Sequence, residues 1–133
     1  MLHPLSELPA SAPDSGAANA AMQRSILNLF ERWQLTDAEA AILLGDISTR
    51  TLGRWRKSDL GRVPRDLAER LSNLLGIHKA LRLVFAEPQR GYAWVRKPNR
   101  DFGGHSALDV MLQGSLTDIL RVRRYLDSLR GGW

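Results

Sequence analysis

Apolar residues recur every three or four positions through most of the chain, which is the spacing of helices with one buried face. The first such run places Ile26, Leu27, Phe30 and Trp33 on one face. Asn19 can cap this run, so we expect a helix from Asn19 to about Trp33. No strand pattern competes along the sequence, and no internal repeat is evident. The pattern therefore predicts an all-α fold.

The next two segments predict a helix, a tight turn and a second helix. The hydroxyl of Thr36 can accept a hydrogen bond from the backbone N–H of Glu39, whose side chain can reach back, which makes a capping box. Gly45 is expected to end this helix, because glycine tolerates a positive φ after the last helical turn. Ser48 can cap the second helix, which should run to about Lys57.

Further helices follow in the second half of the chain. Pro64 suits the first position of a helix over residues 65–86, where its missing N–H costs little. Gly76 leaves open whether this segment is one long helix or two shorter ones. Three more helices are expected: one opened by Glu87 and Pro88, one over residues 106–113 after a serine cap, and one over residues 115–130.

The N-terminal segment differs from the rest in composition. Residues 1–18 are rich in Pro, Ser, Ala and Gly, and we expect a flexible leader because so little apolar surface is available for burial. It lacks the basic start and apolar block of a secretory signal. The expected organisation is a leader over residues 1–18, a helix-turn-helix region over 19–64, connecting helices over 65–86 and a C-terminal domain over 87–133.

Charge and cysteine content narrow the class of protein. The formal net charge of +5 and the isoelectric point near 10.4 favour an anionic partner such as nucleic acid, although a solvated basic surface is the alternative. The absence of cysteine excludes disulfides and thiolate metal sites and fits a cytoplasmic protein. No apolar run approaches the roughly 20 residues needed to span a bilayer. At this length, dimerisation or a partner would add stability.

Positive charge concentrates on the second helix of the helix-turn-helix. On a helical wheel Leu52 and Trp55 point to the core, and Arg50, Arg54 and Lys57 lie on the opposite side. A guanidinium matches the two acceptors of guanine in the major groove, so Arg50 and Arg54 are candidates for base contacts. The alternative is a folding unit with a solvated basic face. The candidate DNA-binding residues are Thr49, Arg50, Gly53, Arg54, Arg56 and Lys57.

Gly53 and the remaining cations complete this face. Glycine inside a helix costs about 1 kcal/mol relative to alanine, so Gly53 makes most sense if another molecule approaches closely. Arg56 and Lys57 better suit phosphates than bases. The sequence therefore predicts a recognition helix with base-reading and phosphate-binding positions.

The C-terminal half has a recognisable layout over residues 92–114, YAWVRKPNRDFGGHSALDVMLQG. A helix ending in Trp is followed by Pro-Asn, a Gly-Gly turn, a Ser cap, Leu-Asp and a closing Gly. This layout resembles the toxin-binding domain of the MbcA/ParS/Xre antitoxin family. The R-T-L-x-R-W core at residues 50–55 resembles the Xre-type helix-turn-helix that accompanies it. Many members have Leu at the position of Phe102 and Pro at that of Ala107, and both departures preserve the local physics.

The resemblance implies an antitoxin of a type II toxin–antitoxin system. Its implied partner is a RES-domain toxin that degrades NAD⁺, held inactive because the antitoxin covers the active-site entrance. The resemblance also implies repression of the shared operon and a homodimer that places two recognition helices on a two-fold operator DNA. A stand-alone dimeric helix-turn-helix transcription regulator is the alternative function.

The last helix supports a partner surface independently of that resemblance. Its apolar row is accompanied by arginines and aromatic residues, the composition of interface hot spots. Solvated arginines and a disordered tail are the alternative. As a hypothesis, the C-terminal tip reaches toward the pocket of the toxin. The candidate toxin-binding residues are Arg121, Arg124, Tyr125, Arg130 and Trp133. The expected core of the C-terminal domain comprises Trp94, Val95, Phe102, Leu108 and Met111.

No pattern in the sequence indicates catalysis. His3, His78 and His105 are far apart, and none has a second ligand at metal-binding spacing. His105 lies near Asp101 and Asp109, but no activated nucleophile accompanies them. No phosphate-binding loop, nucleophile elbow or dinucleotide fingerprint occurs. We therefore expect a binding protein without metal or cofactor, and a small enzyme has no supporting motif.

Overall fold

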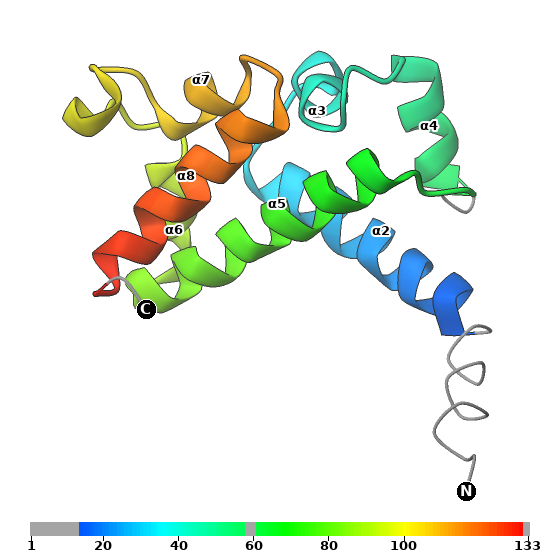
Figure 1. Ribbon diagram of the computed structural model, residues 1–133, viewed down its shortest axis with the longest axis horizontal. Helices are drawn as coiled ribbons and strands as arrows, with labels where there is room; N and C mark the ends of the chain where they lie inside the picture. Colours follow the sequence, from blue (N-terminus) through cyan, green and yellow to red (C-terminus); the bar gives the residue numbers. More distant parts are fainter. Residues whose placement is uncertain (1–13, 58–60, 132–133) are drawn as a thin grey trace, which may run out of the picture.

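A computed structural model describes residues 14–57 and 61–131, and every regular element in that part of the chain is helical (Figure 1). The all-α prediction is confirmed. None of these helices combines the length and apolar character needed to span a membrane. The elements are α2 (Asp14–Arg32), α3 (Asp37–Leu43), α4 (Thr49–Lys57), α5 (Arg65–Val84), α6 (Pro88–Trp94), the 3-10 helix η2 (Arg100–Phe102), α7 (Ala107–Met111) and α8 (Leu116–Leu129).

Hydrogen bonds and backbone geometry confirm the helix ends predicted at Thr36, Gly45 and Ser48. Thr36 and Glu39 form the capping box, with the Glu39 N–H donating to Thr36 Oγ1 over 3.1 Å and the Thr36 N–H donating to Glu39 Oε1 over 2.9 Å. Gly45 has a φ of 97° just after the last turn of α3. The backbone N–H of Thr51 donates to Ser48 Oγ over 3.0 Å, so Ser48 caps α4.

Two further capping boxes start the last two α-helices. Ser106 and Asp109 form one at α7, and Ser115 and Asp118 form one at α8. In each box the aspartate accepts from the backbone N–H of the serine over 3.1 Å. The shorter aspartate takes the place of the more usual glutamate and still reaches that N–H. The serine cap expected at Ser106 is confirmed, and Ser115 caps the helix that was expected to start there.

The expected start of the first helix at Asn19 is wrong. Helix α2 begins at Asp14, so Asn19 lies inside it and residues 14–18 of the expected leader are helical. The segment contains four alanines between residues 17 and 21, the residue type with the strongest helix propensity. The rest of the expected leader lies outside the described residues.

Helix α5 resolves the choice left open at Gly76, because it runs unbroken from Arg65 to Val84. A Cβ at Gly76 would lie 2.6 Å from Cζ of Arg123 on α8. The missing side chain thus leaves room for Arg123 to cross α5, and Arg123 Nη1 donates to Asn73 Oδ1 over 2.7 Å. Glycine is tolerated here because of this helix–helix contact.

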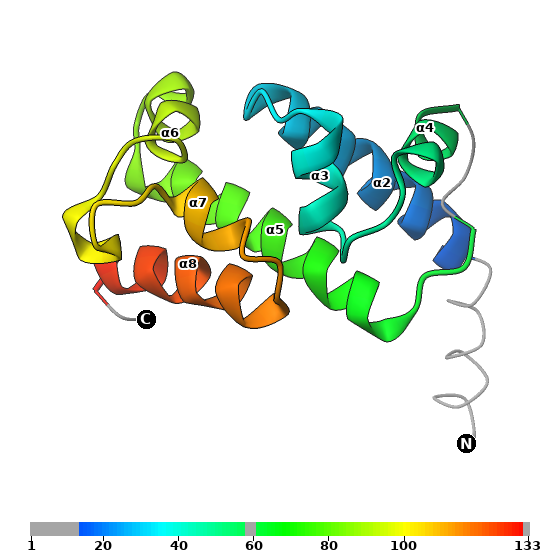
Figure 2. The same ribbon diagram turned by 90° about the horizontal axis from the view of Figure 1, so that it is seen from above.

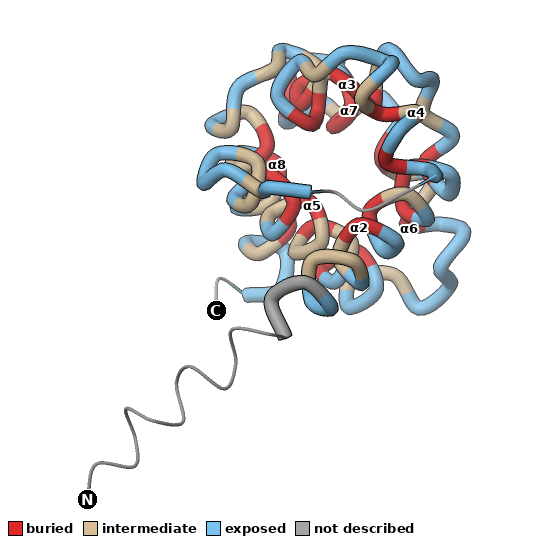
Figure 3. Tube along the Cα trace, turned by 90° about the vertical axis from the view of Figure 1, so that its right-hand side faces the viewer, coloured by how far each residue is buried: buried red, intermediate tan, exposed pale blue. Residues whose placement is uncertain are grey.

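Helix α5 forms the spine of the molecule. It packs against α2, α6 and α8, while α7 packs on α8 and α3 on α4. Helix α8 runs alongside α5 in both ribbon views (Figures 1 and 2). The buried positions, shown in red in Figure 3, turn toward the inside of this arrangement. One continuous core links both halves, and its largest fully buried side chains include Trp33, Leu43, Leu52, Leu74, Ile77, Met111, Ile119 and Leu126.

Candidate nucleic-acid and partner interfaces

Helix α4 presents the cationic face expected from its sequence. Leu52 and Trp55 are 0% and 4% exposed and attach the helix to the core. Arg50, Arg54 and Lys57 are exposed. The backbone carbonyl of Trp55 also accepts a hydrogen bond from the side chain of Gln23 on α2. The helix is therefore held by its apolar side and its C-terminal end, which leaves the opposite side accessible.

Gly53 lies on the accessible side of α4. A Cβ at this position would meet no neighbouring atom within 4 Å. Packing within the chain therefore does not require a glycine here, in contrast to Gly76. The open space is compatible with close approach of another molecule to the helix backbone.

Arg56 connects α4 to α3. Its Nη2 donates to Asp37 Oδ1 over 2.6 Å and thereby ties α4 to the start of α3. This hydrogen bond to Arg56 is the main reason that the pKa of Asp37 lies below its ordinary value. Both side chains are about half exposed, at 47% and 54%, so the pair contributes little to stability. Thr49, the first residue of α4, is exposed.

Two of the candidates on α8 lie beside the same aromatic ring, that of Phe102. Arg121 places its guanidinium 5.4 Å from the centre of the Phe102 ring. Tyr125, one turn later, is half-buried, stacks on Trp94 at 6.0 Å and donates from its hydroxyl to Asp101 Oδ2 over 2.7 Å. The structure thus brings Arg121 and Tyr125 together around Phe102. Tyr125 has a packing role within this domain.

The remaining α8 candidates lie nearer the end of the helix. Arg124 is exposed, and Arg130 Nη1 lies 3.3 Å from Asp127 Oδ1. Trp133 lies outside the described residues. Arg121, Arg124 and Arg130 are therefore exposed, and together they form an arginine-rich edge along α8.

Of the expected core of the C-terminal domain, four side chains are buried and one is partly so. Trp94 is partly buried and contacts the rings of Phe85, Phe102 and Tyr125. The four buried residues are Val95, Phe102, Leu108 and Met111.

Two exposed apolar side chains were missed by the sequence reasoning. Leu83, near the end of α5, is 57% exposed, and Leu129, the last residue of α8, is 50% exposed although it belongs to the apolar row of that helix. The two helices end on the same side of the molecule (Figures 1 and 2). The exposure of Leu83 could have been predicted from the helical spacing, because Leu83 lies beside the row of buried residues of α5 and not within it.

The described residues contain no cluster of three or more His, Cys, Asp or Glu side chains that could hold a metal ion. The interfaces described above consist of cationic, aromatic and apolar side chains. Their chemistry suits the binding of macromolecules.

Comparison with known proteins divides the chain into two matched segments. Residues 12–76 match the family described as the antitoxin Xre-like helix-turn-helix domain. Residues 80–132 match the family described as the antitoxin Xre/MbcA/ParS C-terminal toxin-binding domain. The chain is also 43% identical over 123 residues to the uncharacterized protein y4oB of Sinorhizobium fredii, which covers 92% of this chain and 95% of that relative. Both matched segments include part of α5.

Proposed function

Since the chain belongs to the Xre/MbcA/ParS antitoxins, with a DNA-binding helix-turn-helix domain and a toxin-binding domain, we propose that it neutralises a RES-domain toxin and represses its own operon. Neither family is enzymatic. The proposed neutralisation covers the entrance to the active site of a toxin that degrades NAD⁺. The proposed setting is the cytoplasm, where operon and toxin are found together.

Operator binding is assigned in this proposal to the accessible face of α4. Arg50 and Arg54 read base edges in the major groove, and Lys57 neutralises a phosphate. Their exposure and the open space at Gly53 support this assignment. Thr49 and Arg56 flank the face, with Arg56 also bridging to Asp37. A homodimer presents two such helices to a two-fold operator.

Toxin capture is assigned to the edge formed by α8. Arg121 and Arg124 supply exposed cations, and the half-exposed Leu129 supplies apolar contact at the end of the helix. Tyr125 holds this edge in shape through Trp94 and Asp101. Arg130 and the C-terminal Trp133 follow directly and are the residues proposed to reach the toxin pocket.

The observation that carries the proposal is the distance between the two surfaces along the molecule. Helix α4 lies at one end, beside the start of α5, whereas α5 and α8 both end at the opposite end (Figures 1 and 2). An arrangement of this kind lets one chain hold an operator and a toxin without a clash between them. The match of residues 80–132 to the toxin-binding family favours the antitoxin over a stand-alone dimeric regulator, in which the second surface would serve dimerisation alone.

A crossed pair of double variants tests the assignment. The first, Arg50→Ala with Arg54→Ala, should weaken operator binding at least tenfold in a gel shift, because each bidentate base contact contributes about 1–3 kcal/mol. The second, Arg121→Ala with Arg124→Ala, should weaken protection against the adjacent gene product in a growth assay. Each variant removes two positive charges, so each is the charge-matched control for the other.

The outcomes separate the competing functions. Unchanged operator binding by the first variant would reject the α4 face as the reader. Failure of the adjacent gene product to arrest growth or to co-purify would favour the stand-alone regulator. Full protection by a chain that lacks residues 131–133 would exclude the C-terminal tip from neutralisation.

A further inference from the structure

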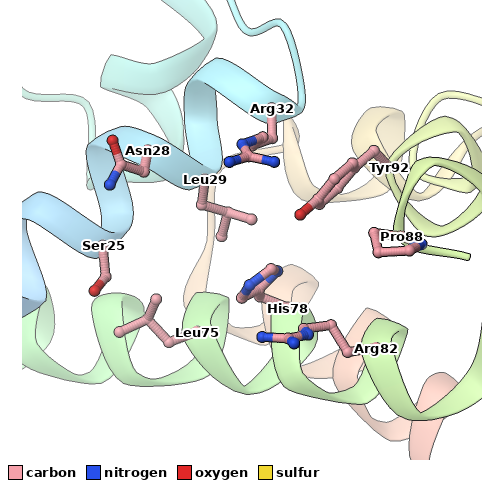
Figure 4. A pocket seen from close by; sticks show the side chains of 9 residues that line it. All are labelled: Ser25, Asn28, Leu29, Arg32, Leu75, His78, Arg82, Pro88 and Tyr92. Atoms are coloured by element: carbon pink, nitrogen blue, oxygen red, sulfur yellow. The ribbon is translucent and has the colours of Figure 1, made fainter.

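A groove of about 520 Å³ lies between α2, α5 and α6 (Figure 4). No residue of α4 or α8 is among those that line it. Arg32 enters it from α2 and Arg82 from α5, and Tyr92 of α6 directs its hydroxyl into the space between them. Ser25 and Asn28 add polar groups on the α2 side. No acidic side chain is among the residues that line the groove.

The two arginines leave the groove with uncompensated positive charge. Within residues 14–57 and 61–131, neither Arg32 nor Arg82 makes an ion pair. Arg32 lies with its guanidinium carbon 5.8 Å from the centre of the Tyr92 ring, so two of the side chains that line the groove contact each other. Two guanidinium groups that line one groove without a carboxylate form a site for an anion, because each can donate several hydrogen bonds to an oxyanion.

His78 forms the floor of the groove between these cations. Its ring stacks on Tyr92 with centroids 6.2 Å apart and planes 8° from parallel. Its Nδ1 is buried and has no hydrogen-bond partner among the described residues. Burial, and then the charges of Arg82 and Arg32, hold the pKa of His78 below its ordinary value. The imidazole is thus neutral near pH 7 and retains an unsatisfied ring nitrogen.

We propose that this groove binds an anionic group, a carboxylate or a phosphate, held between Arg32 and Arg82 with the Tyr92 hydroxyl as a further donor and His78 beside them. The anion neutralises the two guanidinium groups and accepts hydrogen bonds from them. Helix α2 belongs to the segment matched by the helix-turn-helix family, and α6 to the segment matched by the toxin-binding family. Occupancy therefore strengthens the packing between the two domains.

The probes are inorganic phosphate and glutarate, with chloride at equal ionic strength as the control salt. The ring resonances of His78 and Tyr92, followed by two-dimensional NMR of the full chain, should shift saturably with at least one of the two probes. The His78 pKa, measured from the same resonances over a pH series, should rise when the anion is bound, because Arg32 and Arg82 are then neutralised. A response to only one probe identifies the class of anion.

Two double variants test whether the shifts of the ring resonances arise from anion binding in the groove. Arg32→Gln with Arg82→Gln should weaken binding at least tenfold and abolish the rise in the His78 pKa. Arg24→Gln with Lys79→Gln removes two exposed cations from the same two helices outside the groove and should bind as the parent does. If the double groove variant does not fold, the single Arg82→Gln and Arg82→Lys variants provide the comparison. Absence of saturable shifts with both probes, or equal losses in both double variants, would overturn the proposal.

Discussion

At the residue scale, Arg70 connects three segments of the chain that lie apart in the sequence. It is 7% exposed, and its Nε donates to Asp66 Oδ2 over 2.9 Å. Its Nη1 donates to the carbonyl of Leu43 over 3.3 Å, and its Nη2 to that of Gly114 over 2.9 Å. The guanidinium therefore satisfies a carbonyl at the end of α3 and another in the connection between α7 and α8.

We expect Arg70→Met to lower the free energy of unfolding by about 3 kcal/mol, since breaking a buried charged network leaves its acceptors without donors. Urea unfolding followed by circular dichroism measures the change. Asp66→Asn is the control: its side chain is 62% exposed, so the loss should stay below about 1 kcal/mol. Equal losses in the two variants would show that the carbonyl contacts of Arg70 contribute nothing measurable.

At the element scale, the contact between α5 and α8 determines how the two domains are joined. Helix α5 runs through both matched segments, and α8 packs along it. Gly76 gives Arg123 room to cross, and Arg123 in turn bonds Asn73 on α5. Ile119, Val122 and Leu126 are the buried residues of α8. The spacing of apolar residues predicts α8 from the sequence, whereas its close contact with α5 depends on Gly76.

A double-mutant cycle tests this crossing. In the parent, Gly76→Ala should bring little net gain, because the new Cβ displaces the Arg123 guanidinium and weakens its bond to Asn73. In an Arg123→Ala background the same substitution should stabilise the protein by about 1 kcal/mol, the helix-propensity difference between alanine and glycine. Thermal unfolding of the four proteins yields the coupling free energy. Additive effects would contradict the proposed steric conflict.

At the scale of the whole molecule, α4 lies beside the start of α5, whereas α8 runs along α5 and ends beside the opposite end of it (Figures 1 and 2). Binding at one end therefore does not cover the other. Positive charge is exposed on both α4, at Arg50 and Arg54, and α8, at Arg121 and Arg124. This layout is the physical basis for proposing that the antitoxin represses while it holds its toxin.

We predict that operator and toxin bind at the same time. Addition of the co-purified toxin should supershift the operator complex in a gel, and mass photometry should detect a species that contains all components. Arg50→Ala with Arg54→Ala should leave the protein–protein complex intact while removing the supershift. Operator affinity should also fall steeply with salt, because cations contact phosphates. Release of the DNA by the toxin would contradict the independence of the two surfaces.

Local interactions explain what could be predicted from the sequence. The capping box at Thr36, the serine cap at Ser106, the turn at Gly45 and the buried pair Leu52 and Trp55 depend on residues within one or two helical turns. Short spacings of this kind can be followed along the chain. The all-α fold and the cationic face of α4 are predictable for the same reason. The start of α2 was predicted wrongly because Asn19 is a favourable N-cap residue, whereas the alanines around it have a high helix propensity and continue the helix through Asn19.

Tertiary packing decided the remaining features, because it joins residues that are far apart in sequence. Arg70 meets Gly114 from 44 positions away, Arg123 crosses α5 at Gly76, and Tyr125 stacks on Trp94. The groove between Arg32 and Arg82 likewise forms only when α2 is packed on α5. By itself the sequence determined the helices and the face of α4. The tertiary structure decided which charges are paired, which are left unpaired and where the two binding surfaces lie.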